Sequence, residues 1–209
     1  MNPVKPIRKR DRDATRTRIV DAARDLFMEQ GYARTTIADI ARAADVAPQT
    51  IYWAFGSKAG LVREIRDAWF ASARTSERMG QVLALDEPVV RLDAFAGFMR
   101  HQWESGAAAL SIQRDALRVD PDAAADVVAI LEARARGLFE VVKPLGPHLA
   151  PGLTVEKAHD LVLALTLLEI YLELQARGWS DEAYESWLAA ALRTQLLGRK
   201  RAKKRVGRR

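Results

Sequence analysis

Residues 35–58, TTIADIARAADVAPQTIYWAFGSK, decide the fold of the N-terminal part of the chain. Thr36, followed three residues later by Asp39, forms a capping-box pattern that predicts the start of a helix. Pro48 has the fixed φ that suits the first turn of a second helix. The stretch therefore predicts two helices of about nine residues, joined by the tight segment 44–47. Apolar residues stand at the spacings that lock two crossed helices together: Ile37, Ile40, Ala41, Ala44, Val46, Ile51 and Phe55.

A longer helix precedes this pair. Apolar residues recur at helical spacing from Ile19 to Phe27, and Gly31 ends the helix as a left-handed cap would. A supporting helix followed by two short helices with a tight turn is the geometry of a helix-turn-helix. The second short helix turns a polar and aromatic set outward, namely Gln49, Thr50, Tyr52 and Trp53. Such side chains can read base edges or bind phosphate, so the pattern indicates a nucleic-acid-binding surface.

Two runs of this stretch, 35–41 and 50–58, closely resemble the TetR family of bacterial transcriptional regulators. The strong resemblance covers about residues 15–62, and the rest of the chain is similar to the family in length and helical layout. The turn departs from the family pattern at two positions. Asp45 stands where Gly is usual, and Asp tolerates the left-handed region better than most residues. Ala47 stands where Ser is frequent, and it cannot cap the following helix with a side-chain oxygen.

The resemblance implies that six side chains contact DNA: Thr36, Gln49, Thr50, Tyr52, Trp53 and Lys58. In the family the positions of Thr36, Tyr52 and Lys58 contact the phosphate backbone, and the other three positions face bases. Gln can pair with adenine through two hydrogen bonds, and Thr can meet the methyl group of thymine. The alternative for each of these residues is plain solvated surface.

Positive charge gathers at both ends of the chain, whose net charge is +6. Residues 1–18 hold seven Arg or Lys and two Asp, and residues 198–209 hold eight Arg or Lys and no acid. The stretch 80–197 is acidic. Basic ends around an acidic body are typical of a polyanion partner contacted at one end, and solvated tails on a cytoplasmic protein are an equal alternative.

Beyond residue 57 the pattern is helical, and no credible strand pair occurs. We expect a long helix from 57 to about 81, and then helices at about 88–103, 107–119, 122–142, 154–177 and 180–197. The chain is therefore expected to be all-α, with an N-terminal helix-turn-helix domain and a C-terminal helical domain. The expected parts are a basic disordered arm (1–14), a DNA-binding domain of TetR type (15–62, with the helix-turn-helix at about 36–55), a helical effector-binding and dimerisation domain (63–197) and a basic disordered tail (198–209).

The resemblance also implies a cavity for a small-molecule effector among the C-terminal helices. The candidate contact residues are Trp69, Phe98, Trp103, Gln113 and Tyr171. An aromatic stripe at helical spacing more often belongs to a core, and that alternative stays open. The last two expected helices are apolar over a wide arc, which includes Leu165 and Trp187, so each needs two partners. In the family one partner is a second subunit, which implies a homodimer; the alternative is a fully buried core.

Other function classes find little support. The chain has no Cys, which removes disulfides and cysteine nucleophiles and fits a reducing cytoplasm. His101, His148 and His159 lie in separate elements without metal-ligand spacing, and neither a G-x-S-x-G motif nor a phosphate loop occurs. The longest apolar stretch, 161–168, is far shorter than the ~20 residues of a membrane span. We expect a cytoplasmic protein without catalytic residues, cofactor, metal site or membrane contact.

Three functions therefore remain. The leading hypothesis is a homodimeric repressor that a small-molecule effector releases from a double-stranded DNA operator. The first alternative is a constitutive architectural DNA-binding protein without an effector, which predicts low sequence selectivity. The second is a small-molecule carrier or enzyme with a vestigial DNA-binding domain, which predicts no specific DNA binding.

Overall fold

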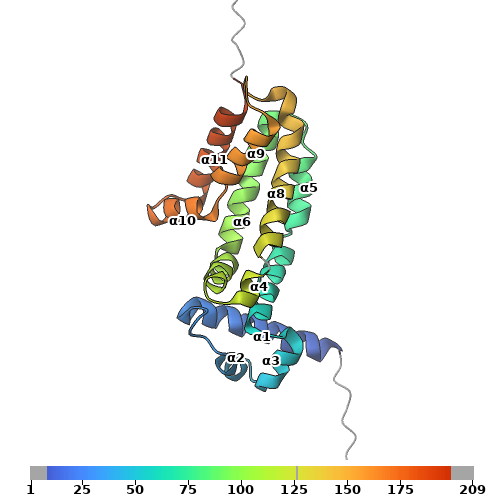
Figure 1. The fold of residues 1–209 in the computed structure, drawn as a ribbon, viewed down its shortest axis with the longest axis vertical. Coiled ribbons are helices and arrows are strands. Elements are labelled where there is room, and N and C mark those ends of the chain that lie inside the picture. The colour runs from blue at the N-terminus through green and yellow to red at the C-terminus, as the bar shows by residue number, and fades with distance from the viewer. Residues whose placement is uncertain (1–8, 126, 199–209) are drawn as a thin grey trace, which may run out of the picture. The chain divides into compact units, whose positions relative to one another are not determined.

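The computed structural model describes residues 9–125 and 127–198, and regular structure in this part of the chain is helical (Figure 1). The predicted all-α fold is confirmed. The helices are α1 (Lys9–Gln30), α2 (Ile37–Ala43), α3 (Pro48–Phe55), α4 (Lys58–Ser72), α5 (Thr75–Leu83), α6 (Pro88–Leu117), α7 (Pro121–Ala124), α8 (Val127–Val142), the 3-10 helix η1 (Lys143–His148), α9 (Val155–Leu165), α10 (Leu168–Ala176) and α11 (Asp181–Leu196).

The chain divides into two compact units. The first comprises residues 1–75 and 105–131, and the second comprises residues 76–104 and 132–209. Helices α6 and α8 contribute residues to both units, since each runs across a unit boundary.

In the first unit, helices α1 to α4 share one apolar core with the C-terminal half of α6. The side chains of Ile19, Ile40, Ile51 and Leu61 are at most 1% exposed. Burial of an aliphatic side chain of this size contributes about 1.5–3 kcal/mol, so these contacts dominate the stability of the short helices. Helix α1 ends as predicted at Gly31, which has a φ of +82°.

The corner between α3 and α4 is tight. The Ser57 hydroxyl accepts a hydrogen bond from the Gly60 amide at 3.2 Å and caps α4. A Cβ atom on Gly60 would stand 1.9 Å from the carbonyl oxygen of Phe55. Only glycine therefore allows the first turn of α4 to approach the end of α3 this closely.

The core of the second unit lies between α6, α8, α9 and α11, and its most buried side chains include Phe95, Val141, Tyr184 and Leu192, none of them exposed. The Tyr184 ring meets Tyr171 of α10 edge-on, with ring centroids 5.1 Å apart. Aromatic pairs in this arrangement add stability beyond the area that they bury.

Several expected helix boundaries are wrong. The helix expected from 57 to about 81 is interrupted, because Arg74 has a φ of +51° between α4 and α5. The two helices expected at about 88–103 and 107–119 are the single helix α6, in which Gly106 packs against Trp69 instead of ending the helix. The helix expected at 122–142 is divided into α7 and α8.

The helix expected at 154–177 is also divided, into α9 and α10. The Arg134 guanidinium on α8 donates from Nη2 to the carbonyl oxygen of Thr166 at 2.6 Å and to its hydroxyl at 2.8 Å. The Thr166 hydroxyl in turn donates to the carbonyl of Val162 at 2.7 Å. The break is thus held by a side chain from another helix. The residues at the break are Thr166 and Leu167, and neither is a helix-breaking Gly or Pro that would predict it.

Residues 9–14, which were expected to be part of a disordered N-terminal arm, belong to α1. Residues 1–8 of the arm and residues 199–209 of the basic tail lie outside the described residues.

Candidate functional site

Helices α2 and α3 are joined by a turn with defined backbone geometry. Asp45 has a φ of +52°, the left-handed conformation that the sequence predicted for this position. The Val46 amide donates to the carbonyl of Ala41 at 3.0 Å, which closes the end of α2. Ile40 and Ile51 are fully buried in the core that the two helices share. The relative position of the two short helices is therefore set by packing and by the turn together.

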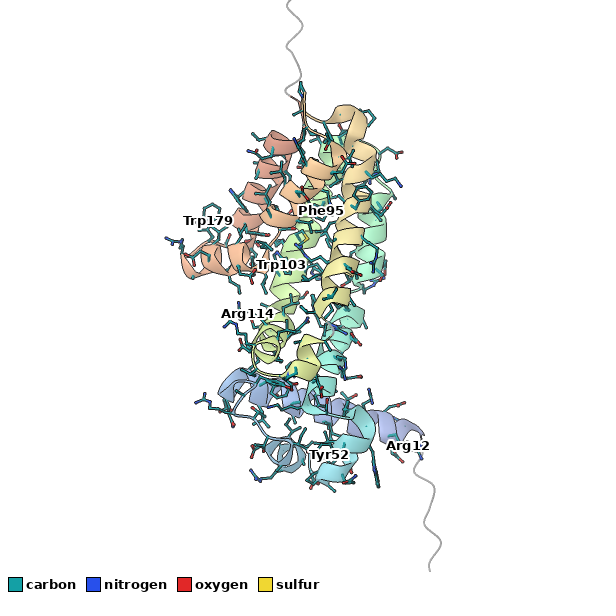
Figure 2. All side chains as sticks on the ribbon, viewed as in Figure 1. Arg12, Tyr52, Phe95, Trp103, Arg114 and Trp179 are labelled. Carbon is teal, nitrogen blue, oxygen red and sulfur yellow. The ribbon has the colours of Figure 1, made fainter. Side chains whose placement is uncertain are left out.

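The outward face of α3 carries large exposed side chains. Trp53 is 81% exposed and Tyr52 is 48% exposed (Tyr52 is labelled in Figure 2). Gln49 is exposed as well, and Thr50 is half-buried. Exposed aromatic rings have no packing role in the monomer, so this face is available to a partner. Ala47 precedes α3 without a side-chain capping bond, as predicted.

Thr36 caps α2 as predicted. Its hydroxyl accepts a hydrogen bond from the Asp39 amide at 3.1 Å and donates to Asp39 Oδ2 at 2.6 Å. Asp39 Oδ2 also accepts from the Thr36 amide at 3.1 Å, which completes the capping box. The hydrogen bonds from Thr36 hold the pKa of Asp39 below its ordinary value. A phosphate that binds Thr36 would have to compete with Asp39 for the hydroxyl proton.

Lys58 is less available to a phosphate than its sequence position implies. Its ammonium group donates to the carbonyl of Tyr32 at 2.9 Å and to that of Thr35 at 3.1 Å. It also lies 4.0 Å from the centroid of the Tyr32 ring. Burial lowers the pKa of Lys58, and the nearby Asp120 carboxylate opposes that effect. An ammonium group has three N–H donors, and two of them bind the carbonyls of Tyr32 and Thr35. One N–H of Lys58 therefore remains for a further acceptor.

Arg16 positions helix α3, a role that the sequence did not reveal. Its Nη1 donates to the carbonyl of Ala54 at 3.1 Å, and its Nε donates to Glu64 Oε1 of α4 at 2.9 Å. Its Nη2 pairs with the second Glu64 oxygen. The guanidinium carbon lies 4.5 Å from the centroid of the Phe55 ring. Arg16 thus ties α1, the end of α3 and α4 together. The sequence showed it only as one of the seven basic residues of the segment 1–18.

The five candidate effector-contact residues are divided between the two units. Trp69 and Gln113 lie in the first unit, whereas Phe98, Trp103 and Tyr171 lie in the second. Most have a structural partner. Trp69 Nε1 donates to the Ser105 hydroxyl at 3.1 Å. Trp103 Nε1 donates to the Tyr184 hydroxyl at 3.1 Å, and the Tyr171 hydroxyl donates to Asp181 at 2.7 Å.

Two of the five candidates, Phe98 and Gln113, line separate hollows. Phe98 lies in a hollow of about 380 Å³ in the second unit, formed by α5, α6 and α11. Its walls also carry Arg78, Gln81, Val82, His101 and Glu185. Gln113 lies at a hollow of about 10 Å³ in the first unit. Its Oε1 is buried and has no hydrogen-bond partner within the described residues. A hollow of that size holds about one water molecule.

The apolar arc of the last helices is only partly used within the chain. Leu188, Leu192 and Leu196 of α11 are fully buried. Leu165 of α9 and Trp187 of α11, on the arc expected to face a second subunit, are half-buried. Leu167 and Trp179, in the segments that join α9 to α10 and α10 to α11, are 45% and 37% exposed. Apolar side chains thus stay accessible on these helices.

Other kinds of site are not found in the described part of the chain. No group of three His, Asp or Glu side chains there could hold a metal ion. None of the described helices has both the length and the apolar character needed to cross a membrane.

Residues 19–65, which include the helix pair, match the family model of the bacterial regulatory proteins of the tetR family. The HTH-type transcriptional regulator TtgR of Pseudomonas putida is 41% identical to the chain over 78 residues. That match covers 35% of this chain and 37% of TtgR, so the chain matches this curated relative over about a third of its length.

Solved structures extend the likeness to nearly the whole fold. NalD of Pseudomonas aeruginosa, the secondary repressor of the MexAB-OprM multidrug efflux pump, superposes with a TM-score of 0.70 at 23% identity, over 90% of this chain and 98% of NalD. The complex of SmeT with triclosan superposes with a TM-score of 0.68 at 18% identity, over 90% of this chain and 93% of SmeT. At these identities the likeness concerns the fold. The match to the family model of the tetR regulatory proteins covers residues 19–65, which contain the helix-turn-helix region.

Proposed function

We propose that the protein is a sequence-specific DNA-binding transcriptional regulator without enzymatic activity, most simply a homodimeric repressor that leaves its operator when a small molecule binds. The observation that carries the proposal is the outward face of α3, where Gln49, Tyr52 and Trp53 are exposed on a helix whose opposite face is buried. A helix held this firmly can enter a major groove without reorganising. Because DNA is the partner, the protein acts in the cytoplasm.

The contacts divide into two kinds. Gln49, Thr50 and Trp53 read bases, while Tyr52, Thr36 and Lys58 contact the phosphate backbone. The free N–H of Lys58 serves a phosphate while its other two bonds hold the turn before α2. Lys58 therefore has both a structural and a DNA-binding role.

A second copy of the chain covers the accessible apolar surface of α9, α10 and α11. Two recognition helices then meet successive major grooves, about 34 Å apart, and the operator has two half-sites. NalD, whose fold the chain shares, is described as a repressor, which supports the sign of regulation proposed here.

The effector site is proposed in the hollow lined by Phe98. Its volume of about 380 Å³ falls within the range of small-molecule pockets. The SmeT complex with triclosan supports a small-molecule effector, since that protein has the same fold. Phe98 alone of the five candidates lines this hollow; the other four, Trp69, Trp103, Gln113 and Tyr171, are not among its lining residues.

Selection from a random pool of double-stranded DNA with the full-length protein tests the proposal. We expect enrichment of one sequence with two inverted half-sites. The double variant Tyr52→Ala/Trp53→Ala, which changes exposed side chains and leaves the core intact, should enrich nothing. Salt-sensitive binding without enrichment would favour the architectural DNA-binding protein. No binding at all would favour the carrier or enzyme with a vestigial domain.

A further inference from the structure

The turn between α1 and α2 is held by side chains from distant parts of the first unit. Tyr32 in this turn is 2% exposed, and its ring lies 5.1 Å from that of Phe27. Its hydroxyl donates to Oδ2 of Asp120, which lies between α6 and α7. Lys58 holds the same turn from α4 through the carbonyls of Tyr32 and Thr35.

Asp120 also holds the corner at which α6 ends. Its Oδ1 accepts from the amides of Asp122 at 2.9 Å and Ala123 at 3.4 Å, which caps α7. Its own amide donates to the carbonyl of Ala116 at 2.9 Å, in the last turn of α6. The two carboxylate oxygens therefore bind different groups: Oδ1 accepts from the amides at the start of α7, and Oδ2 accepts from the Tyr32 hydroxyl.

The position of this turn determines where α2 begins. Thr35 donates from its hydroxyl to the carbonyls of Leu26 at 3.2 Å and Gly31 at 3.0 Å, and the next residue is the cap of α2. Helix α2 packs on α3 through Ile40 and Ile51. A displacement of the turn is therefore passed to the recognition helix by contacts that are already close-packed.

We propose that the Tyr32–Asp120 hydrogen bond is the connection through which α6 controls the position of the helix-turn-helix, and that it is made in the DNA-binding conformation. Helix α6 is one continuous helix with residues 88–104 in the second unit and 105–117 in the first. An effector that displaces α6 in the second unit moves Asp120 and pulls on Tyr32. Tyr32 and Asp120 are thus positioning residues that touch no DNA. This inference rests on the proposed DNA-binding function.

Three variants of the full-length protein test the connection. Tyr32→Phe removes only the hydroxyl. Asp120→Asn keeps an oxygen that can cap α7, because Asn caps helices as well as Asp does, and presents an amide nitrogen to Tyr32. The third variant combines both changes. The control is Ile112→Val, which shortens a buried side chain of α6 in the same unit and breaks no hydrogen bond.

The measurements are the affinity for the DNA duplex enriched in the selection above, by fluorescence anisotropy, and amide hydrogen exchange in residues 37–55. Each single variant should bind the duplex about tenfold more weakly, within the roughly 5–150-fold span of coupling between protein sites. The double variant should bind no more weakly than the singles, because the bond from the Tyr32 hydroxyl to the Asp120 carboxylate is lost in all three. Exchange in residues 37–55 should rise, whereas Ile112→Val should change neither readout.

The outcomes separate the two proposals. If the wild type binds the duplex and Tyr32→Phe binds it equally well, the connection is refuted and the DNA-binding function stands. Additive effects of Tyr32→Phe and Asp120→Asn would also refute it, since the residues would then act independently. A wild type that binds no duplex would refute both proposals. An affinity loss of the same size in Ile112→Val would assign the effect to stability alone.

Discussion

Gly106 of α6 lies directly against the indole ring of Trp69 of α4, so closely that a Cβ atom on Gly106 would stand 2.2 Å from Cζ2 of Trp69. The contact explains why a glycine occupies the interior of a long helix, where it costs about 0.5–1 kcal/mol relative to alanine. It also fixes the Trp69 indole, whose nitrogen reaches the Ser105 hydroxyl one residue earlier in α6.

Gly106→Ala should therefore destabilise the protein. The added methyl group has no space unless Trp69 moves, and overpacking of this kind costs about 1–3 kcal/mol. Gly137→Ala is the matched control, because a Cβ atom there would meet nothing within 4 Å. The free energy of unfolding of Gly137→Ala should exceed that of the wild type by about 0.4–1 kcal/mol. Urea titrations give both values, and equal effects of the two substitutions would contradict the role of the Trp69 contact.

The elements that the sequence predicted best are those with local signals. Thr36, Asp45 and Pro48 act within a few residues of their own position, and the structure has the cap, the turn and the helix start where these residues predict them. The breaks at Arg74 and Thr166 have no such signal. At Thr166 the cause is Arg134, which lies 32 residues away in sequence.

The same limit applies to the candidate site. The outward face of α3 follows from helical periodicity, so Tyr52 and Trp53 could be placed correctly. The bonds that position α3 could not be predicted, because they join residues far apart in the chain. Arg16 and Glu64 are 48 residues apart, and Tyr32 and Asp120 are 88 residues apart. A single sequence does not reveal which carboxylate meets which donor.

Gln49→Ala should relax the preference for one base position of the operator. A bidentate contact to a base contributes about 1–3 kcal/mol of discrimination, and an alanine cannot replace it. Tyr52→Phe is the comparison, since the loss of a phosphate contact should weaken binding to all duplexes to a similar extent. Lys58→Ala is a poorer comparison, because it also removes the bonds to Tyr32 and Thr35. Selection profiles of the variants measure the difference, and an unchanged profile for Gln49→Ala would remove Gln49 from the base-reading set.

The double variant Leu165→Glu/Trp187→Glu should be monomeric and should lose operator binding. Both side chains are half-buried in the single chain, so charges there can stay solvated in a monomer. In a dimer the same charges would be desolvated without a partner. Val128→Glu, at a position that is 62% exposed, should remain dimeric. Sedimentation velocity reports the oligomeric state, and a double variant that still dimerises would place the subunit interface elsewhere.

The stabilising effect of the Tyr32 hydroxyl should depend on pH. The hydrogen bond from Tyr32 holds the pKa of Asp120 below its ordinary value of 3.8. Because the pKa of Asp120 is lower in the folded protein, the carboxylate contributes its full stabilisation when the pH is above its ordinary pKa of 3.8. This stabilisation is lost as the pH falls through the lower pKa that Asp120 has in the folded protein. The difference in unfolding free energy between wild type and Tyr32→Phe should therefore shrink between pH 5 and pH 2 (about the range in which carboxylates titrate). A difference that stays constant over that range would mean that the hydroxyl acts without the carboxylate.

Glu64→Gln separates the positioning of α3 from simple electrostatics. The Glu64 carboxylate binds Arg16 through both oxygens, while Arg16 Nη1 holds the carbonyl of Ala54 at the end of α3. If only long-range charge mattered, the loss of an acid from the DNA-binding domain would strengthen binding to a polyanion. If Arg16 positions α3, the loss of its partner should weaken operator binding, because a glutamine offers one acceptor oxygen in place of two. Asp25→Asn is the matched control: Asp25 is an exposed acid of α1 whose ion pair with Arg24 lies within the same helix, so its loss removes a charge without touching a bond to α3. Anisotropy titrations at two salt concentrations measure the affinity of both variants for the operator. We expect weaker binding for Glu64→Gln and equal or tighter binding for Asp25→Asn. Tighter binding by both variants would mean that Arg16 contributes charge and does not position α3.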